Sequence, residues 1–295
     1  NIDTDIGDVA RSLKESGLSG IKRVTIKVGR PIQAMLAKRV DDFEELQKRF
    51  PNEMAVEEKY DGERVQVHIK QGAVTLFSRR LEDITNQFPE VVQGVKKTFK
   101  GKSAVLDGEI VHHENGTFGS FQELMERRRK YDIKTYKTKI PVTGFFFDIL
   151  YLDGKSLMKT SYPERRKLLE ENLKQGKYAK LAKRIVTADL NRAEQFFKQT
   201  VDKGFEGVVI KSVSDDSFYQ PGKRGFLWVK WKREYIKGIQ DTFDLAVIGL
   251  FYGKGRRSDT FGALLCAVRN SKNSMYESFT KVGTGFTDKD FEELR

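Results

Sequence analysis

The sequence predicts an α+β fold in which a large antiparallel-sheet domain is followed by a small, incomplete β-barrel. Segments of alternating apolar and polar residues, typical of half-buried strands, recur between residues 54 and 232 with helical segments interspersed. Tight turns such as Lys70-Gln71-Gly72 favour antiparallel pairing of these strands. After residue 238 the pattern changes to short strands joined by a Gly-rich, basic loop, which is typical of a small barrel.

The first residues are too few to form a domain of their own. Residues 5–14 have the apolar stripe of a capped helix, which Ser and Gly residues at 16–20 are expected to end, and residues 24–28 alternate like a strand. We therefore assign residues 1–28 to the end of a larger N-terminal unit or to a linker.

The main domain is expected to span residues 29–237. Its predicted helices cover residues 41–50, 121–130, 163–173 and 192–201. Its predicted strands follow the short apolar stretch at 54–56 and cover residues 65–69, 74–78, 104–111, 143–152, 207–211 and 226–232.

The final unit, residues 238–295, contains three further strand patterns. They cover residues 244–251, 262–269 and 275–282, and a helix is expected to begin at residue 287. We expect the barrel that these strands begin to be incomplete.

Composition narrows the classes of function. With 295 residues, 38% hydrophobic and 33% charged, the chain fits a soluble protein of about two domains, and its high charge suits a thermophile. No apolar run approaches the roughly 20 residues that span a membrane, and no signal peptide is recognisable. The net charge of +12 favours a polyanionic partner, although a basic surface can also serve solubility alone.

Cysteine and histidine content limits the kinds of metal site. Cys266 is the single cysteine, which excludes an intrachain disulfide, and with only three histidines a zinc site is not expected. Any metal should be a hard cation held by carboxylates.

Residues 57–64, Glu-Glu-Lys-Tyr-Asp-Gly-Glu-Arg, carry the first chemical signal. Lys59 lies where one strand ends, and Asp61-Gly62 predicts a turn into the next strand. A lysine in this place can project into a cleft, but it is a nucleophile only as the neutral amine, which requires burial or nearby positive charge. The same octapeptide, taken alone, is also compatible with a hairpin turn and a solvated lysine.

Further motifs stand mostly on strands or at strand ends. They are Phe77-Ser78-Arg79, Leu106-Asp107-Gly108-Glu109, Phe146-Phe147-Asp148, Glu206-Gly207-Val208-Val209-Ile210-Lys211 and Trp228-Val229-Lys230-Trp231-Lys232. Together with residues 57–64 they resemble the covalent nucleotidyltransferases, the superfamily of polynucleotide ligases and capping enzymes. The closest resemblance is to ATP-dependent DNA ligases of the archaeal and eukaryotic replicative type. It covers nearly the whole chain, including residues 241–244 and 281–286.

The resemblance implies a nucleotidyltransferase (adenylation) domain at residues 29–237 and a partial OB-fold domain at residues 238–295. It implies that Lys59 attacks ATP to form a covalent lysyl-AMP. AMP then passes to the 5′-phosphate of nicked DNA, and the 3′-hydroxyl seals the nick. Such phosphoryl transfer depends on positioning and charge neutralisation.

The resemblance also implies roles for the nucleotide-binding residues. Glu57 matches the residue that reads the adenine amino group, Arg64 matches a ribose contact, and Phe147 matches the ring that stacks on adenine. Core packing is the competing explanation for Phe147, because neighbouring phenylalanines alternate across the sheet. Arg79 and Arg224 match contacts to the nucleotide or the DNA end.

The remaining matched residues surround the phosphates. Lys211, Lys230 and Lys232 are expected near them, and the last two lie on one strand face, where they would also favour the neutral amine of Lys59. Glu109 and Glu206 are expected to hold Mg²⁺ or Mn²⁺, or the ribose hydroxyls. Solvated strand faces and ordinary surface ion pairs are the competing explanations.

Contacts to DNA are less defined. The basic runs at residues 127–130 and 254–257 could grip phosphates without reading sequence, or could be solvated faces. Nicked double-stranded DNA is the expected partner, with a sliding clamp as a further candidate. We expect a monomer, cytoplasmic in an archaeon or nuclear in a eukaryote, with no membrane partner.

Two departures from the family pattern limit the expected activity. Most of the helical DNA-binding domain that precedes the core in this family is missing, and so is the basic motif that ends the OB domain. We therefore expect slow self-adenylation and poor nick closure. The alternatives are an RNA ligase or GTP-dependent capping enzyme of the same superfamily, and a nucleic-acid-binding module without catalysis.

Overall fold

The computed structural model describes residues 5–22, 25–40, 43–114, 116–129, 140–233, 243–253, 260–270 and 274–293. The chain divides into two compact units, residues 1–237 and 238–295. Mixed α+β structure with mostly antiparallel sheets confirms the predicted fold class. Within the described residues, no helix is both long enough and apolar enough to cross a membrane.

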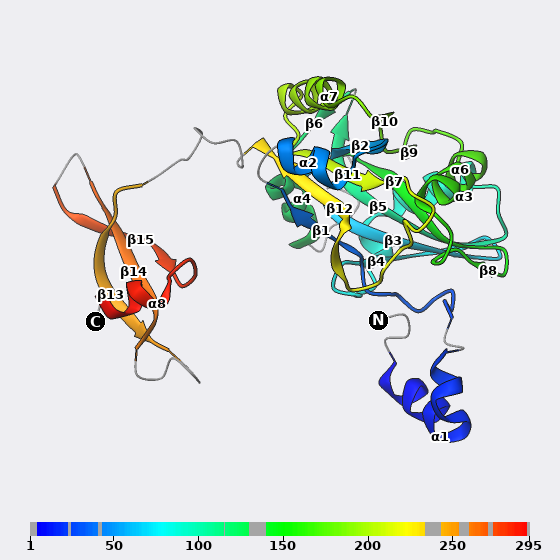
Figure 1. Ribbon diagram of the computed structural model, residues 1–295, viewed down its shortest axis with the longest axis horizontal. Coiled ribbons are helices and arrows are strands. Elements are labelled where there is room, and N and C mark those ends of the chain that lie inside the picture. Colours follow the sequence, from blue (N-terminus) through cyan, green and yellow to red (C-terminus); the bar gives the residue numbers. More distant parts are fainter. Residues whose placement is uncertain are drawn as a thin grey trace. The chain divides into compact units, whose positions relative to one another are not determined.

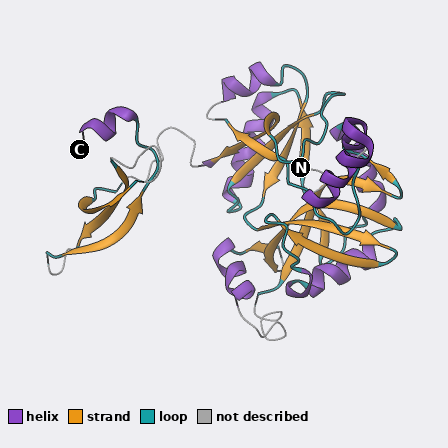
Figure 2. Ribbon diagram, turned by 90° about the horizontal axis from the view of Figure 1, so that it is seen from below, coloured by secondary structure: helices purple, strands orange, loops and turns teal. Residues whose placement is uncertain are grey.

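Two sheets form the centre of the first unit, and helices lie around them (Figures 1 and 2). The first sheet has the order β1-β12-β11-β2-β10. Its strands are β1 (Leu36–Arg39), β12 (Arg224–Lys232), β11 (Gly207–Ser212), β2 (Met54–Lys59) and β10 (Arg184–Thr187). All pairs are antiparallel except β1 with β12.

The second sheet follows the order β4-β3-β5-β7-β8, with β6 paired to β5 and β9 paired to β7. Its strands are β3 (Glu63–Lys70), β4 (Ala73–Ser78), β5 (Ser103–Glu114), β6 (Thr117–Phe118), β7 (Val142–Leu152), β8 (Lys155–Ser156) and β9 (Ala179–Leu181).

Each sheet has its own hydrophobic core on its outer side. The first sheet packs against α2 (Phe43–Arg49) and α7 (Leu190–Asp202), burying Leu46, Phe196 and Phe197. The second sheet packs against α3 (Pro89–Thr98), α4 (Phe121–Arg129) and α6 (Tyr162–Asn172). A third cluster joins the two sheets at one end and includes Met35 and Trp228. Away from this cluster, many residues on the inner faces are polar or charged.

Local expectations were mostly accurate, with clear exceptions. The helices beginning near residues 121, 163 and 192 agree with α4, α6 and α7 to within two residues. The first helix, α1 (Ile6–Lys22), kinks at Gly17 instead of ending there. The strand predicted at residues 24–28 is wrong where it is described, because residues 25–28 form no strand and Ile26 is buried in the third cluster.

The second unit contains a three-stranded antiparallel sheet, half of a small barrel, with the order β13-β14-β15. Its elements are β13 (Ala246–Tyr252), β14 (Phe261–Arg269), β15 (Tyr276–Val282) and α8 (Asp288–Glu293). Phe261, Leu264 and Cys266 form its small core. This arrangement agrees with the incomplete barrel expected from the sequence.

Candidate active site

A cleft of about 980 Å³ lies in the first unit and is lined by residues of both sheets. All eleven residues that the sequence singled out line it: Glu57, Lys59, Arg64, Arg79, Glu109, Phe147, Glu206, Lys211, Arg224, Lys230 and Lys232. Its volume lies within the range of cavities that hold small ligands and cofactors. Residues separated by more than 170 positions in the chain thus converge on one pocket.

Strand register explains how the first sheet builds one wall. Lys59, Gly207 and Lys232 are Cα partners across β2, β11 and β12. Two residues toward the C-terminus of β11, and two toward the N-termini of the antiparallel β2 and β12, the row is Glu57, Val209 and Lys230. Two further residues along, it is Ala55, Lys211 and Trp228. Because alternate residues of a strand share a face, these three rows all face the cleft.

Glu206, the residue before Gly207, pairs with both lysines of the Lys59 row. Its Oε2 atom lies 2.6 Å from Lys59 Nζ and 2.8 Å from Lys232 Nζ. Burial alone would raise the pKa of Glu206, but the two ammonium groups outweigh burial and the pKa lies below its usual value. Burial and the adjacent Glu206 carboxylate raise the pKa of Asp61, whose carboxyl hydrogen-bonds with Glu206. The Lys59 side chain is 23% exposed, so a ligand in the cleft can reach it.

Gly207 permits this close arrangement. Its φ of 144° is unusual for residues with a side chain, and a Cβ atom here would lie 2.2 Å from the carbonyl oxygen of Trp231. A glycine is therefore required between the strands that carry Lys59 and Lys232.

Lys230 adds a further cation to the same wall. It is partly buried, and no carboxylate of the described residues lies within ion-pair distance of its amine. Burial and the nearby ammonium groups of Lys232 and Lys59 lower its pKa. This end of the cleft is thus rich in positive charge, which suits a phosphate group.

Lys211 lies at the other end of the wall, four residues along β11 from the Lys59 row, or about 13 Å at roughly 3.3 Å per residue. It is 1% exposed and pairs with Glu57. Its Nζ lies 4.5 Å from the ring centroid of Phe147 and 4.3 Å from that of Trp228. Burial lowers its pKa, and the Glu57 carboxylate limits the fall. Lys211 is therefore a partner of Glu57 deep in the cleft, whereas the family resemblance implied a place near the phosphates.

The second sheet supplies the opposite wall. Arg64 on β3 is the Cα partner of Glu109 on β5, and Phe147 on β7 lies beyond them. Burial raises the pKa of Glu109 to about 8, although Lys59 and Arg64 oppose the rise. Phe147 is partly exposed, whereas Phe145 and Phe146 are buried in separate clusters. Of these three rings, Phe147 is the one that lines the cleft.

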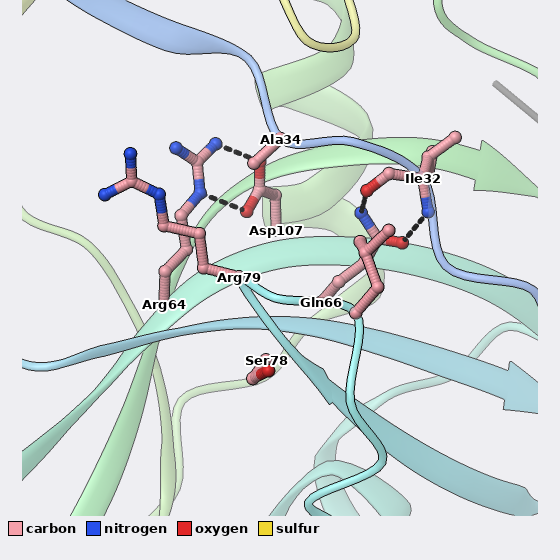
Figure 3. A pocket seen from close by; sticks show the side chains of 8 residues that line it. Ile32, Ala34, Arg64, Gln66, Ser78, Arg79 and Asp107 are labelled. Atoms are coloured by element: carbon pink, nitrogen blue, oxygen red, sulfur yellow. Dashed lines mark hydrogen bonds and ion pairs between the residues drawn. The ribbon is translucent and has the colours of Figure 1, made fainter. Parts of the chain in front are cut away.

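Arg64 is fixed by Asp107, which belongs to a sequence motif but was given no role of its own. Its Nε and Nη2 atoms donate to the two oxygens of Asp107 at 3.1 and 2.7 Å (Figure 3). Its Nη1 atom donates to Met35 O at 2.7 Å. Tyr219 also donates to Asp107, at 2.8 Å. Asp107 stands two residues before Glu109 on the same strand face, and this spacing was the one local signal for it.

The turn after β4 carries two exposed arginines, Arg79 and Arg80, to the rim of the cleft. Figure 3 shows the Arg79 side chain on the same side of the sheet as Arg64. Arg224, at the start of β12, is likewise exposed. These arginines have the accessibility expected of contacts to a bound ligand.

One proposed DNA contact is wrong. Arg127 is buried, pairs with Glu90, and donates to Ile140 O at 2.8 Å, so it holds α4 against α3. The side chains of Arg128 and Arg129, and all of Lys130, lie outside the described residues, as does the basic run at residues 254–257.

Comparison with known proteins gives consistent matches. The family model described as "ATP dependent DNA ligase domain" matches residues 34–232. A DNA ligase 1 of Methanosarcina mazei is 52% identical over 99% of this chain and 52% of its own length. A probable DNA ligase of Aquifex aeolicus is 45% identical over the whole chain and 50% of its own length. The chain therefore spans about half the length of the curated relatives it matches.

Solved structures show the same fold. A mycobacterial DNA ligase D, complexed with ATP and MES, is 28% identical and covers 89% of this chain and 76% of its own, with a TM-score of 0.54. The ligase domain of LigD from M. tuberculosis, also 28% identical, covers the same shares of the two chains with a TM-score of 0.53.

Proposed function

The chain belongs to the ATP-dependent DNA ligase family, and from this premise we propose that it is the nucleotide-charging region of a DNA ligase, with Lys59 as the nucleophile. One observation carries the proposal: Lys59 lies in a nucleotide-sized cleft beside Glu206, with Lys230 and Lys232 on the same wall. We assign residues 29–237 to the adenylation domain, 238–295 to part of the OB domain, and 1–28 to the end of a preceding unit or to a linker.

The first step is attack by the neutral Lys59 amine on the α-phosphorus of ATP. A phosphorus–nitrogen bond forms, the bond to pyrophosphate breaks, and the amine gives up a proton to water. Lys230 and Lys232 offset the charge that gathers on the phosphate oxygens. In the second step a 5′-phosphate oxygen of nicked DNA takes the AMP and releases Lys59. In the third, the 3′-hydroxyl attacks that 5′-phosphate, displaces AMP and seals the strand.

The rest of the cleft positions the nucleotide. Phe147 would stack on the adenine, Glu57 with Lys211 would read its edge, and Arg64, held by Asp107, would contact the ribose. Arg79 and Arg224 at the rim would bind the phosphates or the DNA end. Positioning of this kind supplies a large share of the rate in phosphoryl transfer.

Glu109 and Glu206 fit a hard divalent cation, Mg²⁺ or Mn²⁺. Glu109 is a partly buried carboxyl whose pKa of about 8 reflects burial without sufficient compensating charge, and a cation would supply that charge. Mg²⁺ is usually held by one or two carboxylates together with substrate phosphates and water, so two carboxylates are enough. When bound, the cation would neutralise phosphate charge.

Mass spectrometry after incubation with ATP and Mg²⁺ tests the proposal. We expect the mass of one AMP to be added, and peptide mapping to place it at Lys59. Lys59→Ala should remove the adduct, whereas Lys198→Ala, at an exposed ion pair on α7, should keep it. An adduct that survives Lys59→Ala refutes the nucleophile.

The second half of the reaction is tested with the charged protein and nicked DNA. Transfer of AMP to the 5′-phosphate supports a DNA ligase. A GMP adduct in place of AMP would point to a capping enzyme, and transfer to nicked RNA alone would point to an RNA ligase. If the protein bound DNA but formed no nucleotide adduct, it would be a nucleic-acid-binding module without catalysis.

A further inference from the structure

The Glu57 carboxylate is held by three buried donors from outside its own strand. Its Oε1 atom accepts hydrogen bonds from the Tyr162 hydroxyl and from Arg166 Nη1 at 3.4 Å, while Oε2 pairs with Lys211. Glu57 is 2% exposed and Tyr162 is 0% exposed, so water does not compete for these bonds. A carboxylate offers about four acceptor sites. Three are occupied here, which leaves about one for a ligand in the cleft.

The direction of the Tyr162 hydroxyl is fixed by a second contact. Arg184 Nη1 lies 3.3 Å from the Tyr162 oxygen, and because a guanidinium only donates, the hydroxyl proton must point to Glu57. Arg184 is held in turn by Glu170, which also pairs with Arg166. Burial and the nearby Glu57 carboxylate raise the pKa of Tyr162 well above its usual value, so the hydroxyl remains a donor.

Tyr162 acts on the ligand only through Glu57 and Lys211, the cleft residues that it contacts. Glu57 and Lys211 line the cleft, whereas Tyr162 is not among the described residues that line it. The Lys211 ammonium lies 4.8 Å from the Tyr162 ring centroid, so the same ring also fixes the donor beside Glu57. The cleft therefore presents one fixed acceptor and one fixed donor side by side.

The acceptor of this pair, Glu57, distinguishes the edges of the two purines. Adenine carries an amino group at position 6, which donates, whereas guanine carries a carbonyl oxygen there, which accepts. The remaining acceptor site of Glu57 can bind the first and opposes the second. We propose that Tyr162, oriented by Arg184, is a positioning residue that aims Glu57 at the 6-amino group and so sets the preference for ATP over GTP. This inference rests on the proposed function.

The test is the ratio of adduct formation with ATP to that with GTP, measured as second-order charging rates for the wild type and for Tyr162→Phe. Loss of a buried hydrogen bond to a charged group should slow charging with ATP by about tenfold to a hundredfold. Charging with GTP should change by less than about threefold. The lost hydrogen bond orients Glu57 toward a donor, and guanine carries no donor at position 6. The ATP:GTP ratio should therefore fall about tenfold or more. A ratio within about threefold of the wild type overturns the inference.

Tyr60→Phe is the matched control. Tyr60 is also buried and donates to a neighbouring carboxylate, Glu58, at 2.9 Å, but it does not touch Glu57. Its removal should leave the ATP:GTP ratio unchanged even if stability falls. If the ATP:GTP ratio fell equally in both variants, the preference would depend on packing around the cleft in general and not on the hydrogen bond from Tyr162 to Glu57. That result would overturn the inference.

Arg184→Met keeps the test decisive should Tyr162→Phe fail to fold. The Arg184 side chain is 18% exposed, at the edge of the first sheet, so this change is easier to accommodate. The ratio should fall about threefold, and Arg184→Lys, which restores a donor, should recover part of it. An unchanged ratio in Arg184→Met refutes the proposed relay. If the wild type forms no adduct with either nucleotide, the proposed function fails and the inference falls with it. If only the ratio fails to respond, the proposed function stands.

Discussion

Acidification is expected to destabilise the first unit through His68. This side chain is 2% exposed, its Nδ1 accepts a hydrogen bond from Gly29 N at 2.9 Å, and its Nε2 donates to Gln66 Oε1 at 2.8 Å. Burial lowers its pKa to about 4, against about 6.5 in an unfolded chain. Between these values the unfolded state binds more protons than the folded state. The free energy of unfolding therefore falls as the pH falls.

Proton linkage sets the size of the effect. With these two pKa values, lowering the pH from 7 to 5 removes about 2 kcal/mol of stability through His68 alone. The change in the free energy of unfolding is measured by urea denaturation of the wild type and of His68→Gln at both pH values. Because both tryptophans, Trp228 and Trp231, belong to the first unit, their fluorescence reports that unit.

Each protein in this experiment is compared with itself at the two pH values. The cost of the substitution at neutral pH therefore cancels, and so does the titration of groups common to both proteins. The wild type should lose about 2 kcal/mol more than the variant between pH 7 and 5. Equal losses in the two proteins would refute the reasoning.

Three further substitutions probe the cleft and its support. Lys232→Met should slow AMP adduct formation by about 10² to 10³-fold, because a cation beside the phosphate is removed, and a quench-flow time course with an unchanged rate would contradict this. Gly207→Ala should lower the thermal midpoint, because its Cβ would meet the Trp231 carbonyl oxygen at 2.2 Å; an unchanged midpoint would show that the strands can move apart. Arg127→Met should lower the free energy of unfolding, measured by urea denaturation, by about 3 to 5 kcal/mol, because Glu90 is left buried and unpaired. The adduct rate per folded molecule should stay the same, and a specific loss of DNA binding would restore the phosphate-contact hypothesis.

The rows of the first wall could be predicted from sequence because they depend on local alternation. Lys230 and Lys232 share a face by spacing alone, and the same rule places Glu57 on the Lys59 face. The motifs therefore carried enough information to name the residues of the cleft. Their order along the strands, which separates Lys211 from Lys59, required the register.

The contacts that hold these residues could not be predicted, because their partners are remote in sequence. Tyr162 lies 105 residues from Glu57, and Tyr219 lies 112 residues from Asp107. Each is an aromatic residue in an otherwise ordinary segment, without a local pattern that marks it. Only tertiary packing brings them to a carboxylate.

Two errors have similar causes. α3 was not predicted because Gly94 and valines weaken its helical signal, yet Gly94 is there because a Cβ would lie 2.8 Å from Tyr178. Arg127 was grouped with its basic neighbours, although on a helix the residues of one run point in different directions and this one points inward.

The length of β11 sets the spacing between the two ends of the cleft wall. In the proposed binding mode, the Lys59 amine beside Gly207 would face the phosphates and Lys211 at the other end would contact the base edge, and the backbone repeat of β11 would set the distance between them. Insertion or deletion of a single residue within β11 would turn the side chains at one end of the strand from the cleft toward the core with α7, while those at the other end would stay in place. The length of this segment is therefore as restrictive as its composition. Variation in related chains should be accommodated in the turns on either side of it.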